Sequence, residues 1–535
     1  DGMPPEKGIG AVKRSIRDLM RPVFLVDFDG QLGVARRGNI TIGDAPLAGP
    51  SGYPLRAYCP PLHPDDLGDP VFKKAHHLRY AYIIGAMANG ITSTRMVEEA
   101  GRAGMLGFFG AAGLRLNEIE SAIFRLHQRI GSIPFGFNLI HNLNEPELEA
   151  QTVQLYLRHK IRLISASAFV DLTLPLVYFR VKGIHQDQAG NIICPNRIIA
   201  KVSRVEVAAK FLSPPPEKLI DRLIEKKMIT PQEAALSRSL PMADDLTAEA
   251  DSGGHTDNRP AILLLPTMLA LRDKLNEKYR FKRSICIGLG GGIATPESAA
   301  AAFSMGAAYV LSGSINQACL EAGTSEVVRR MLSETQQADV TMAPAADMFE
   351  TGSRVQVLKR GTLFPFRASK LYDRYSRYNS YDDIPEKEKI VLERDIFNLS
   401  FLDEWNRTKQ FFTAKDPKQI VLAEKDAHHK MALVFRSYLG RSSKWANSGN
   451  PERKFDYQIW CGPSMGAFNA WVKGSFLAKP ENRKVVTVAM NLLFGAAVLT
   501  RVSWLRNQNI ELPNSVGHIA PTRLSEIYKL LNEKD

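Results

Sequence analysis

The feature that most constrains the fold is a regular alternation of short apolar segments with helical ones between residues 80 and 314. Eight apolar segments have the length of strands buried on both faces, and helical segments separate them. Eight consecutive strand–helix units over roughly 250 residues predict a closed (β/α)8 barrel, the TIM barrel. A doubly wound open sheet is the alternative, and the unbroken run of units favours the barrel. The predicted strands are residues 81–87, 105–109, 133–139, 161–167, 197–203, 246–250, 284–290 and 308–314.

The chain on either side of this alternation predicts two further parts. Residues 1–70 form an N-terminal preamble with a small hairpin that turns at an Asp-Gly pair. The barrel itself is assigned to residues 71–345, and a polar helical insertion at about 204–242 precedes its sixth strand. We expect this insertion to form a lid over the carboxyl ends of the strands. Charged and aromatic helical segments then predict a mostly helical C-terminal domain at 346–535.

Composition limits the classes of protein that the chain can belong to. Its five cysteines form no CxxC pair and no metal-ligand cluster, so we expect reduced thiols, a cytoplasmic location and no metal. No N-terminal stretch resembles a signal peptide. The apolar segment 485–505 contains Asn491 and Arg501 and predicts a buried helix rather than a membrane span.

The formal net charge is +13, with 69 basic and 56 acidic residues. The basic residues are dispersed and no RNA-reading motif occurs, so nucleic acid is not the expected partner. A moderate positive field suits an acidic protein or a phosphorylated cofactor equally well, and an ordinary solvated surface has the same composition.

Small residues follow both the seventh and the eighth predicted strand. The seventh ends in GLGGG, and a Thr-Pro pair then caps and starts a helix. In a barrel these two loops are the usual place for a phosphate, because free backbone N–H groups and a helix N-terminus attract an anion. A tight turn alone would explain a triple glycine, but two consecutive small-residue turns favour an anion site. The candidate phosphate residues are Gly291, Gly292, Gly313 and Ser314.

Three other strand ends carry small or polar residues that would meet at the same mouth. GAMANG, at the end of the first strand, leaves room for a flat ring against the backbone, although an ordinary turn would have the same kind of sequence. The third strand ends near Asn138 and the fifth near Lys201. The candidates in the first of these loops are Ala86, Met87, Ala88 and Asn89.

A histidine follows the sixth predicted strand in EADSGGHTDNRP, residues 249–260. Two glycines before His255 let the backbone approach a flat group or adopt dihedral angles that other residues avoid. An imidazole there can titrate near neutral pH. A hydrogen-bonded loop histidine would have the same sequence, so these residues alone leave both interpretations open.

In this order, AMANGIT, AGMLGFFG, FGFNL, SGGH, GGGI and SGS resemble the FMN-dependent nitronate monooxygenase (2-nitropropane dioxygenase-like) barrels. That group includes FMN-dependent enoyl reductases of fatty-acid synthesis. EADSGGHTDNRP, the insertion before it, the N-terminal preamble and WCGPSMGAFNAWVKGSFL (460–477) are most similar to the PfaD-type proteins. Those are trans-acting enoyl reductases of polyunsaturated fatty acid and polyketide synthases, and the likeness covers nearly the whole chain.

The resemblance implies a cofactor, a substrate and roles for the candidate residues. FMN would place its phosphate on the two small-residue turns and its ring against residues 86–89 and Gly253, with Asn138 and Lys201 at its polar edge. NADPH would reduce the flavin, which would then reduce a trans-2-enoyl thioester held on an acyl carrier protein. His255 is the candidate catalytic residue, as a proton donor to the α-carbon or as a hydrogen-bond donor to the thioester. A homodimer is also implied.

Three alternatives share parts of this pattern. Nitronate oxidation is the first, but the wider family usually has Glu-Ala before Gly-Gly-His, where this chain has Asp251 and Ser252. An inosine-monophosphate-dehydrogenase-like enzyme would need a cysteine nucleophile on a mouth loop, whereas Cys286 and Cys319 are predicted within a strand and a helix. A flavin-bearing protein that docks onto a synthase without catalysis is the third.

Overall fold

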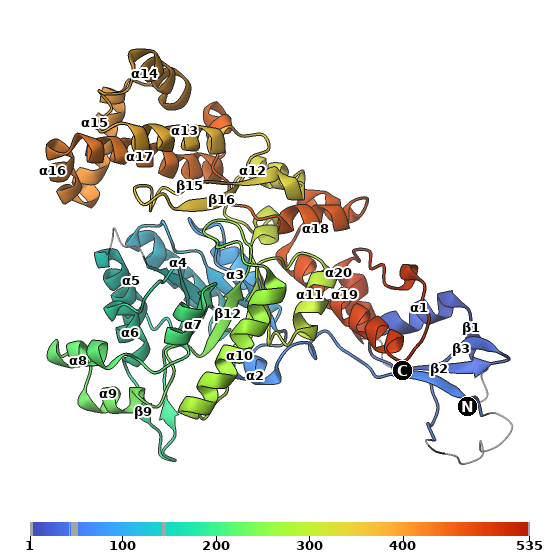
Figure 1. Cartoon of the computed structure of the whole chain (residues 1–535). Helices are drawn as coiled ribbons and strands as arrows, with labels where there is room; N and C mark the ends of the chain where they lie inside the picture. Colours follow the sequence, from blue (N-terminus) through green and yellow to red (C-terminus); the bar gives the residue numbers. More distant parts are fainter. Residues whose placement is uncertain (1–3, 42, 44–51, 142–145, 533–535) are drawn as a thin grey trace.

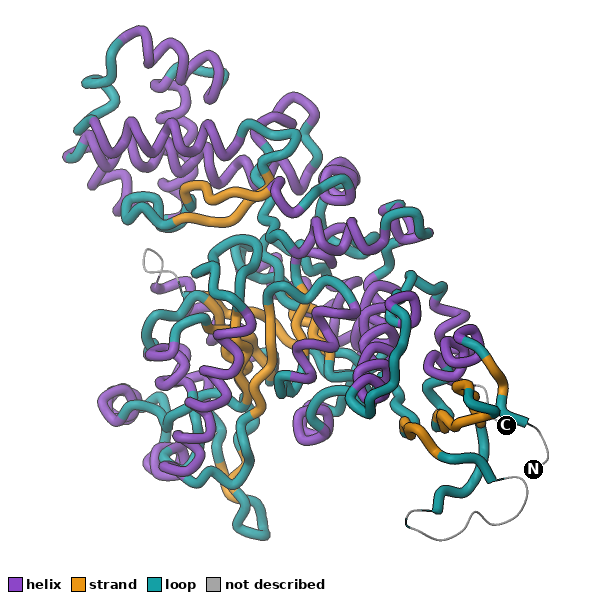
Figure 2. The backbone as a smooth tube through the Cα atoms, turned by 45° about the vertical axis from the view of Figure 1, so that its right-hand side comes forward, coloured by secondary structure: helices purple, strands orange, loops and turns teal. Residues whose placement is uncertain are grey.

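A computed structural model describes residues 4–41, 43, 52–141 and 146–532 of the chain. Figure 1 shows a central barrel, a helical domain above it, and a small β-sheet to one side together with the last helices of the chain. Figure 2 separates the barrel strands from a β-hairpin that lies between the barrel and the helical domain. The barrel therefore lies in contact with both other parts.

The predicted strands form a closed, parallel barrel, which confirms the predicted fold. The strands follow the chain around the barrel, and the last one pairs with the first through Val310 and Tyr82. Apolar side chains from both faces of the strands are buried, as parallel sheets require. The strands are β5 (Tyr82–Ile84), β6 (Leu106–Phe109), β7 (Gly136–Ile140), β8 (Leu163–Ser167), β11 (Arg197–Val202), β12 (Asp245–Glu249), β13 (Cys286–Gly290) and β14 (Val310–Ser312).

Helices connect these strands on the outside of the barrel. A short helix, α2 (Pro70–His76), closes the amino-terminal end of the barrel. The Phe72 ring of α2 stacks on Tyr309 at 4.1 Å, and the His76 Nε2 lies 2.6 Å from Asp245 Oδ2 in the buried interior. The connecting helices are α3 (Thr94–Arg102), α4 (Leu116–Ile130), α5 (Pro146–Arg158), α6 (Leu174–Val181), α7 (Val205–Phe211), α10 (Ala261–Tyr279) and α11 (Pro296–Ser304).

The predicted helical insertion is present, but it does not lie over the carboxyl ends of the strands, so its assignment as a lid was wrong. It forms α8 (Glu217–Glu225) and α9 (Pro231–Ser237) after α7 has already returned to the amino-terminal end of the barrel. There Lys182, just after α6, donates a hydrogen bond to the Met228 carbonyl at 3.1 Å. The hairpin β9 (His185–Gln186)–β10 (Ile192–Ile193) lies at the same end, away from the helical domain (Figure 1).

The segment predicted as one C-terminal domain at 346–535 divides into two parts. Its first part has a core of its own, which includes Phe349, Phe435 and Tyr438. The remainder, from about residue 464, shares one core with the barrel and the N-terminal sheet. This first part also includes β15 (Val340–Pro344), which was predicted within the barrel range. Together with the turns up to Trp460 we call it the helical domain, and its other elements are β16 (Arg354–Leu358), α13 (Phe364–Arg377), α14 (Glu386–Leu392), α15 (Phe401–Lys415), α16 (Pro417–Lys425) and α17 (Ala427–Ser448).

The last helices join the N-terminal sheet to the barrel. The elements concerned are α18 (Ser464–Val472), α19 (Val485–Arg506), α20 (Leu524–Asn532), α1 (Ile9–Arg17), β1 (Glu6–Lys7), β2 (Val23–Phe28), β3 (Gln31–Ala35) and β4 (Leu55–Cys59). The predicted hairpin is β2–β3, and its turn places Asp29 and Gly30 at φ 54° and 72°. Helix α19 is long and apolar enough to cross a membrane, but 83% of its most apolar stretch is buried, because it packs between α11 and the sheet. It is a core helix, as expected from its sequence.

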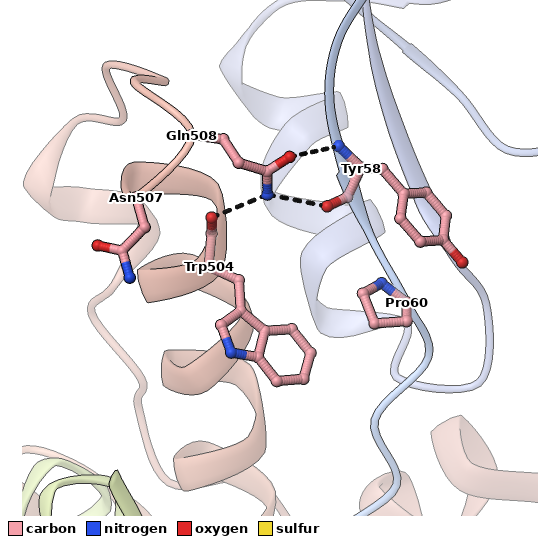
Figure 3. A pocket seen from close by; sticks show the side chains of 5 residues that line it. All are labelled: Tyr58, Pro60, Trp504, Asn507 and Gln508. Atoms are coloured by element: carbon pink, nitrogen blue, oxygen red, sulfur yellow. Dashed lines mark hydrogen bonds between the residues drawn. The ribbon is translucent and has the colours of Figure 1, made fainter. Parts of the chain in front are cut away.

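Two polar side chains, one in α19 and one just after it, attach this helix to the N-terminal segment. The buried Arg501 donates hydrogen bonds to the carbonyl groups of Ile16 (3.0 Å) and Arg21 (2.7 Å). Gln508 extends the exposed edge of β4: its Oε1 accepts from the Tyr58 N–H at 3.0 Å, and its Nε2 donates to the Tyr58 carbonyl at 2.9 Å (Figure 3). The hollow beside this contact, of about 250 Å³, lies at the sheet and not at the barrel mouth.

Candidate functional site

The β15–β16 hairpin of the helical domain lies on the loop that carries the predicted histidine. Gly254 and Gln356 pair as antiparallel strand residues, with N–H to carbonyl distances of 2.9 and 2.7 Å. The Gln356 side chain adds two hydrogen bonds, to Asp251 Oδ1 (2.8 Å) and to the Ser252 carbonyl (2.7 Å). Four hydrogen bonds thus fix this loop to the helical domain, which occupies the place where the insertion was expected.

His255 lies between the barrel and the helical domain. Its Nε2 is 2.9 Å from Asp347 Oδ2, and its ring meets the edge of Trp460 with centroids 5.6 Å apart. Gly254, at φ +81°, has to be glycine, because a Cβ there would lie 2.6 Å from the Trp460 ring. The His255 side chain is 26% exposed, so it is held on one side and remains accessible to a ligand.

The partner of the histidine is an ionised carboxylate. Burial alone would raise the pKa of Asp347, but the hydrogen bond and charge of His255 and the charge of Arg436 outweigh it and lower that pKa. An ionised carboxylate only accepts hydrogen bonds, so Nε2 of His255 carries the proton between the two residues. Nδ1 is then the ring nitrogen that can face a substrate, and Asp347 compensates the positive charge of the ring when both nitrogens are protonated.

Lys201 extends from β11 into a small polar chain at the mouth. Its ammonium group contacts Glu249 Oε1, and Ser252 Oγ donates to the same carboxylate oxygen at 3.2 Å. The lysine charge is therefore neutralised within the protein. The carboxylate of Glu249 was missed as a site residue, although it is the first residue of the EADSGGH motif.

Both predicted asparagines hold the loops of the mouth. Asn138, buried on β7, accepts hydrogen bonds from the N–H groups of Ala111 (2.7 Å) and Ala112 (3.2 Å) through its Oδ1. Its amide NH2 is left as the part that can contact a ligand. Asn89, at φ +58°, donates from Nδ2 to Ser443 Oγ of α17 at 3.1 Å, so its side chain reaches the helical domain. The neighbouring residues 86–88 of this loop are partly exposed, as a surface for a flat ring requires.

The two small-residue turns lie beside each other at the ends of β13 and β14. Their backbone N–H groups have no acceptor among the described residues of the protein. A Cβ at Gly292 or Gly313 would meet no described atom within 4 Å, so there is open space beside these two glycines. Ser314 Oγ, by contrast, already accepts a hydrogen bond from the Gly462 N–H at 3.2 Å. These features fit a phosphate group, which needs several unpaired N–H donors and room to approach them. The four residues concerned are the predicted ones, Gly291, Gly292, Gly313 and Ser314.

The helix that follows the first turn contributes less than predicted. Thr295 caps α11 through its Oγ1, and Ser298 Oγ accepts from the N–H groups of Ala294 (2.9 Å) and Thr295 (3.0 Å). These side chains already satisfy the N–H groups of Ala294, Thr295 and Ser298. The loop amides, rather than this helix N-terminus, are therefore the available anion donors.

No cysteine of the chain is placed as a nucleophile. All five are free thiols, and burial raises the pKa of Cys461, which lies against Gly253 at the mouth, to about 12. Burial likewise raises the pKa of Cys286 and Cys319 well above the usual value. Thiols of this kind stay protonated, so the structure offers no thiolate for covalent chemistry of the inosine-monophosphate-dehydrogenase kind.

Comparison with known proteins gives matches to both main parts of the chain. The model of the nitronate monooxygenase family matches residues 71–372. The model of the inserted helical domain of [acyl-carrier-protein] S-malonyltransferase matches residues 378–457. The first match contains the barrel and the β15–β16 hairpin, and the second lies within the helical domain.

Two individual relatives are named for polyketide biosynthesis and for a polyunsaturated fatty acid synthase. The polyketide biosynthesis protein PksE of Bacillus subtilis is 47% identical over 436 residues, which are 81% of this chain and 56% of that protein. A component of the polyunsaturated fatty acid synthase of a Thraustochytrium species is 42% identical over 449 residues, 83% of this chain and 30% of that protein. The chain thus spans about half or less of these curated relatives.

One solved structure is similar over nearly its whole length. The enoyl reductase domain of MlnA, from the macrolactin biosynthesis cluster of Bacillus amyloliquefaciens, superposes with a TM-score of 0.78 at 42% identity. The match covers 83% of this chain and 99% of that domain. It therefore includes the barrel and most of the rest of the chain.

Proposed function

The chain belongs to the nitronate monooxygenase family, and we propose that within this family it is an FMN-dependent enoyl reductase of the PfaD type. Its reaction would be the reduction of a trans-2-enoyl thioester on an acyl carrier protein by NADPH, in polyunsaturated fatty acid or polyketide synthesis. The observation that carries this proposal is the match over 99% of the MlnA enoyl reductase domain. A match to the barrel alone would support only the wider family.

FMN fits the residues at the mouth. The unpaired N–H groups of the two small-residue turns would hold its phosphate, and residues 86–88, Gly253, Asn138 and Lys201 would surround its ring. When bound, FMN would supply hydride transfer from NADPH to the β-carbon of the enoyl thioester. The Lys201–Glu249 pair offers both a cationic and an anionic group at the polar edge of the site.

The protein's own residues would then have to supply one proton to the substrate. Reduction of the double bond adds a hydride at the β-carbon and a proton at the α-carbon, and the negative charge that develops on the thioester oxygen needs a hydrogen-bond donor. His255 can do either through Nδ1, while Asp347 holds Nε2 and fixes the orientation of the ring. Asp347 is thus a positioning residue in this proposal, and it belongs to the helical domain.

The partners and location follow from the same proposal. The carrier would be an acyl carrier protein domain of a fatty acid or polyketide synthase, because the relatives named above are components of such systems. A cytoplasmic location remains a prediction from the sequence, and a homodimer remains an implication of the family resemblance. The match of the helical domain to an insertion in a carrier-dependent transferase agrees with a substrate on a carrier.

The test is the visible spectrum of the purified protein without oxygen. NADPH should bleach the flavin, and addition of a crotonyl thioester should then restore the oxidised spectrum promptly. Bleaching that only oxygen reverses would contradict enoyl reduction and favour nitronate oxidation or a docking role without catalysis. Absence of flavin binding after FMN is added would refute the cofactor assignment itself.

A further inference from the structure

The helical domain exposes a group of apolar side chains where the chain leaves β16 and enters α13. Leu363, Phe366 and Phe455 are 47%, 70% and 63% exposed, whereas large apolar side chains usually lie inside a domain. Two hydrogen bonds join the two segments: the Leu363 N–H donates to the Phe455 carbonyl at 2.7 Å, and Thr362 Oγ1 donates to the same oxygen at 3.0 Å. Clustered exposure of this kind marks a contact surface.

Cationic side chains lie in the same two segments. Lys359 and Lys454 are exposed and form no ion pair with the part of the chain that the structure describes. Arg360 lies 3.6 Å from Asp339, and an exposed pair at that separation contributes little. The apolar side chains are therefore flanked by cations that a partner can use.

The nearby buried carboxylate does not balance this charge. Asp456 already accepts a hydrogen bond from Tyr438 (2.6 Å) and contacts both Arg367 and Arg453. One carboxylate therefore faces two guanidinium groups, and the surroundings of the cluster keep a positive excess. A partner that is acidic at its contact face fits this surface.

A second exposed apolar group, at the barrel mouth, has fewer cations that a partner could use. Val205, Ile262 and Leu263 begin α7 and α10, which pack against each other, and all three are exposed. The adjacent cation Arg204 is held by Asp257 through two hydrogen bonds of 3.0 Å each. Arg259, just before α10, is exposed and forms no ion pair with a described residue, but its charge also acts on Asp257. An acidic partner therefore meets one available cation there, and has less to gain than beside Lys359 and Lys454.

These exposed apolar and cationic side chains also lie close to the loop that carries His255. Gln356 pairs with Gly254, next to His255, and Leu363 follows Gln356 by seven residues. A chain advances at most about 3.5 Å per residue, so Leu363 lies within roughly 25 Å of that pair. A substrate on a flexible prosthetic arm can bridge a distance of this order.

We propose that this cluster is the surface on which the acyl carrier protein docks, with its acidic face towards the cations and apolar side chains between them. The inference rests on the proposed function for the nature of the substrate, and on the exposed side chains for the place of docking. The cations would speed association, and the apolar contacts would hold the complex. The surface, here called the carrier patch, consists of Leu363, Phe366, Phe455, Lys359, Arg360 and Lys454.

The experiment compares two double charge reversals in the full chain. K359E/K454E changes the carrier patch, and K218E/K226E makes the same charge change on and next to α8, at the other end of the barrel. Each is assayed with crotonyl-loaded holo acyl carrier protein and with the crotonyl thioester of N-acetylcysteamine. We expect K359E/K454E to raise KM for the loaded carrier about tenfold, since two surface attractions become repulsions. Turnover of the small thioester should stay unchanged, and the α8 variant should match the wild type with both.

Direct binding separates this inference from the proposed function. Calorimetric titration with holo acyl carrier protein should show weaker binding for K359E/K454E and for F455S than for the α8 control. If wild type reduces neither thioester, the proposed function fails, and loss of carrier binding in these variants still supports the patch. Unchanged binding and KM in K359E/K454E would overturn the inference. A drop in molecular mass of these variants in solution would also overturn it, because the patch would then join two copies of this chain.

Discussion

Removal of the Asp347 carboxylate tests whether the helical domain acts on the histidine of the mouth. The bond to His255 is 2.9 Å long and has a charged acceptor, and such bonds contribute about 1.5–3 kcal/mol. Both side chains are partly exposed, at 26% and 39%, so solvent screening reduces this to about 1–1.5 kcal/mol. Asp347→Ala should therefore slow enoyl reduction roughly tenfold. Asp347→Asn, which keeps a neutral acceptor, should slow it less.

The assay follows the two halves of the reaction separately by stopped-flow absorbance. His255 is needed when the thioester accepts its proton, so only reoxidation of the reduced protein by a crotonyl thioester should slow. Reduction by NADPH should keep the wild-type rate, and this is a distinction that a general loss of structure would not produce. Because the pKa of Asp347 is lowered, its carboxylate is ionised at neutral pH. The advantage of wild type should thus persist down to about pH 4 and disappear as the pH falls below the lowered value.

A double-mutant cycle gives the result that would refute this reasoning. If Asp347 acts through the imidazole, Asp347→Ala should cause no further loss in a His255→Ala background. Losses that multiply would show that Asp347 acts elsewhere, for instance on the hairpin that carries it. Flavin content and melting temperature of all three variants serve as controls for folding.

Three further changes test other parts of the structure. Gly254→Ala should lower the free energy of unfolding by about 1–3 kcal/mol, measured by urea denaturation. Residue 254 has a φ of +81°, and the new Cβ would lie 2.6 Å from the Trp460 ring. Unchanged stability would contradict this close approach. Gly313→Asp should weaken FMN binding at least about tenfold, measured by fluorescence titration, because the carboxylate and the phosphate carry like charge. The melting temperature of the apoprotein should stay the same, because a Cβ at this position meets no described atom within 4 Å. Asp245→Asn should destabilise the barrel by about 3 kcal/mol, because it breaks the buried pair with His76. Burial alone would raise the pKa of Asp245, but its contacts with His76 and Arg283 outweigh burial and lower that pKa. The difference in melting temperature between wild type and Asp245→Asn should therefore be full above about pH 4 and shrink at lower pH. A difference that grows on acidification would contradict the pairing.

The barrel could be predicted because its evidence is local. Each strand is a short apolar run, and each helix has its own periodicity, so the order of units is readable without long-range contacts. The position of the insertion depended instead on connectivity. It follows α7, which descends from the mouth, and a segment after that helix must lie at the amino-terminal end. Polar helical character, on which the lid prediction rested, says nothing about which end of a barrel a segment occupies.

The surroundings of His255 could not be predicted, because its partners are remote in sequence. Asp347 lies 92 residues further along the chain, and Trp460 lies 205 residues further. Asp347 belongs to no motif that spacing or composition would single out, and Trp460, although it opens the quoted segment 460–477, carries no sign there that it contacts the histidine. Glu249 is a different case, since it stands six residues before the histidine in the quoted motif, and a buried strand end with a carboxylate beside a lysine could have drawn attention to it.

The contacts at the mouth also explain why the chain needs its helical domain next to the barrel. The loop 251–255 is held by Gln356 and Asp347, and these belong to the domain rather than to the barrel. Asn89, on the opposite side of the mouth, bonds to Ser443 of the same domain. Motion of the helical domain would therefore displace both sides of the mouth and the orientation of His255 together. A carrier that docks on this domain would bind to the same domain that positions the histidine, so substrate delivery and proton transfer would both depend on this part of the chain.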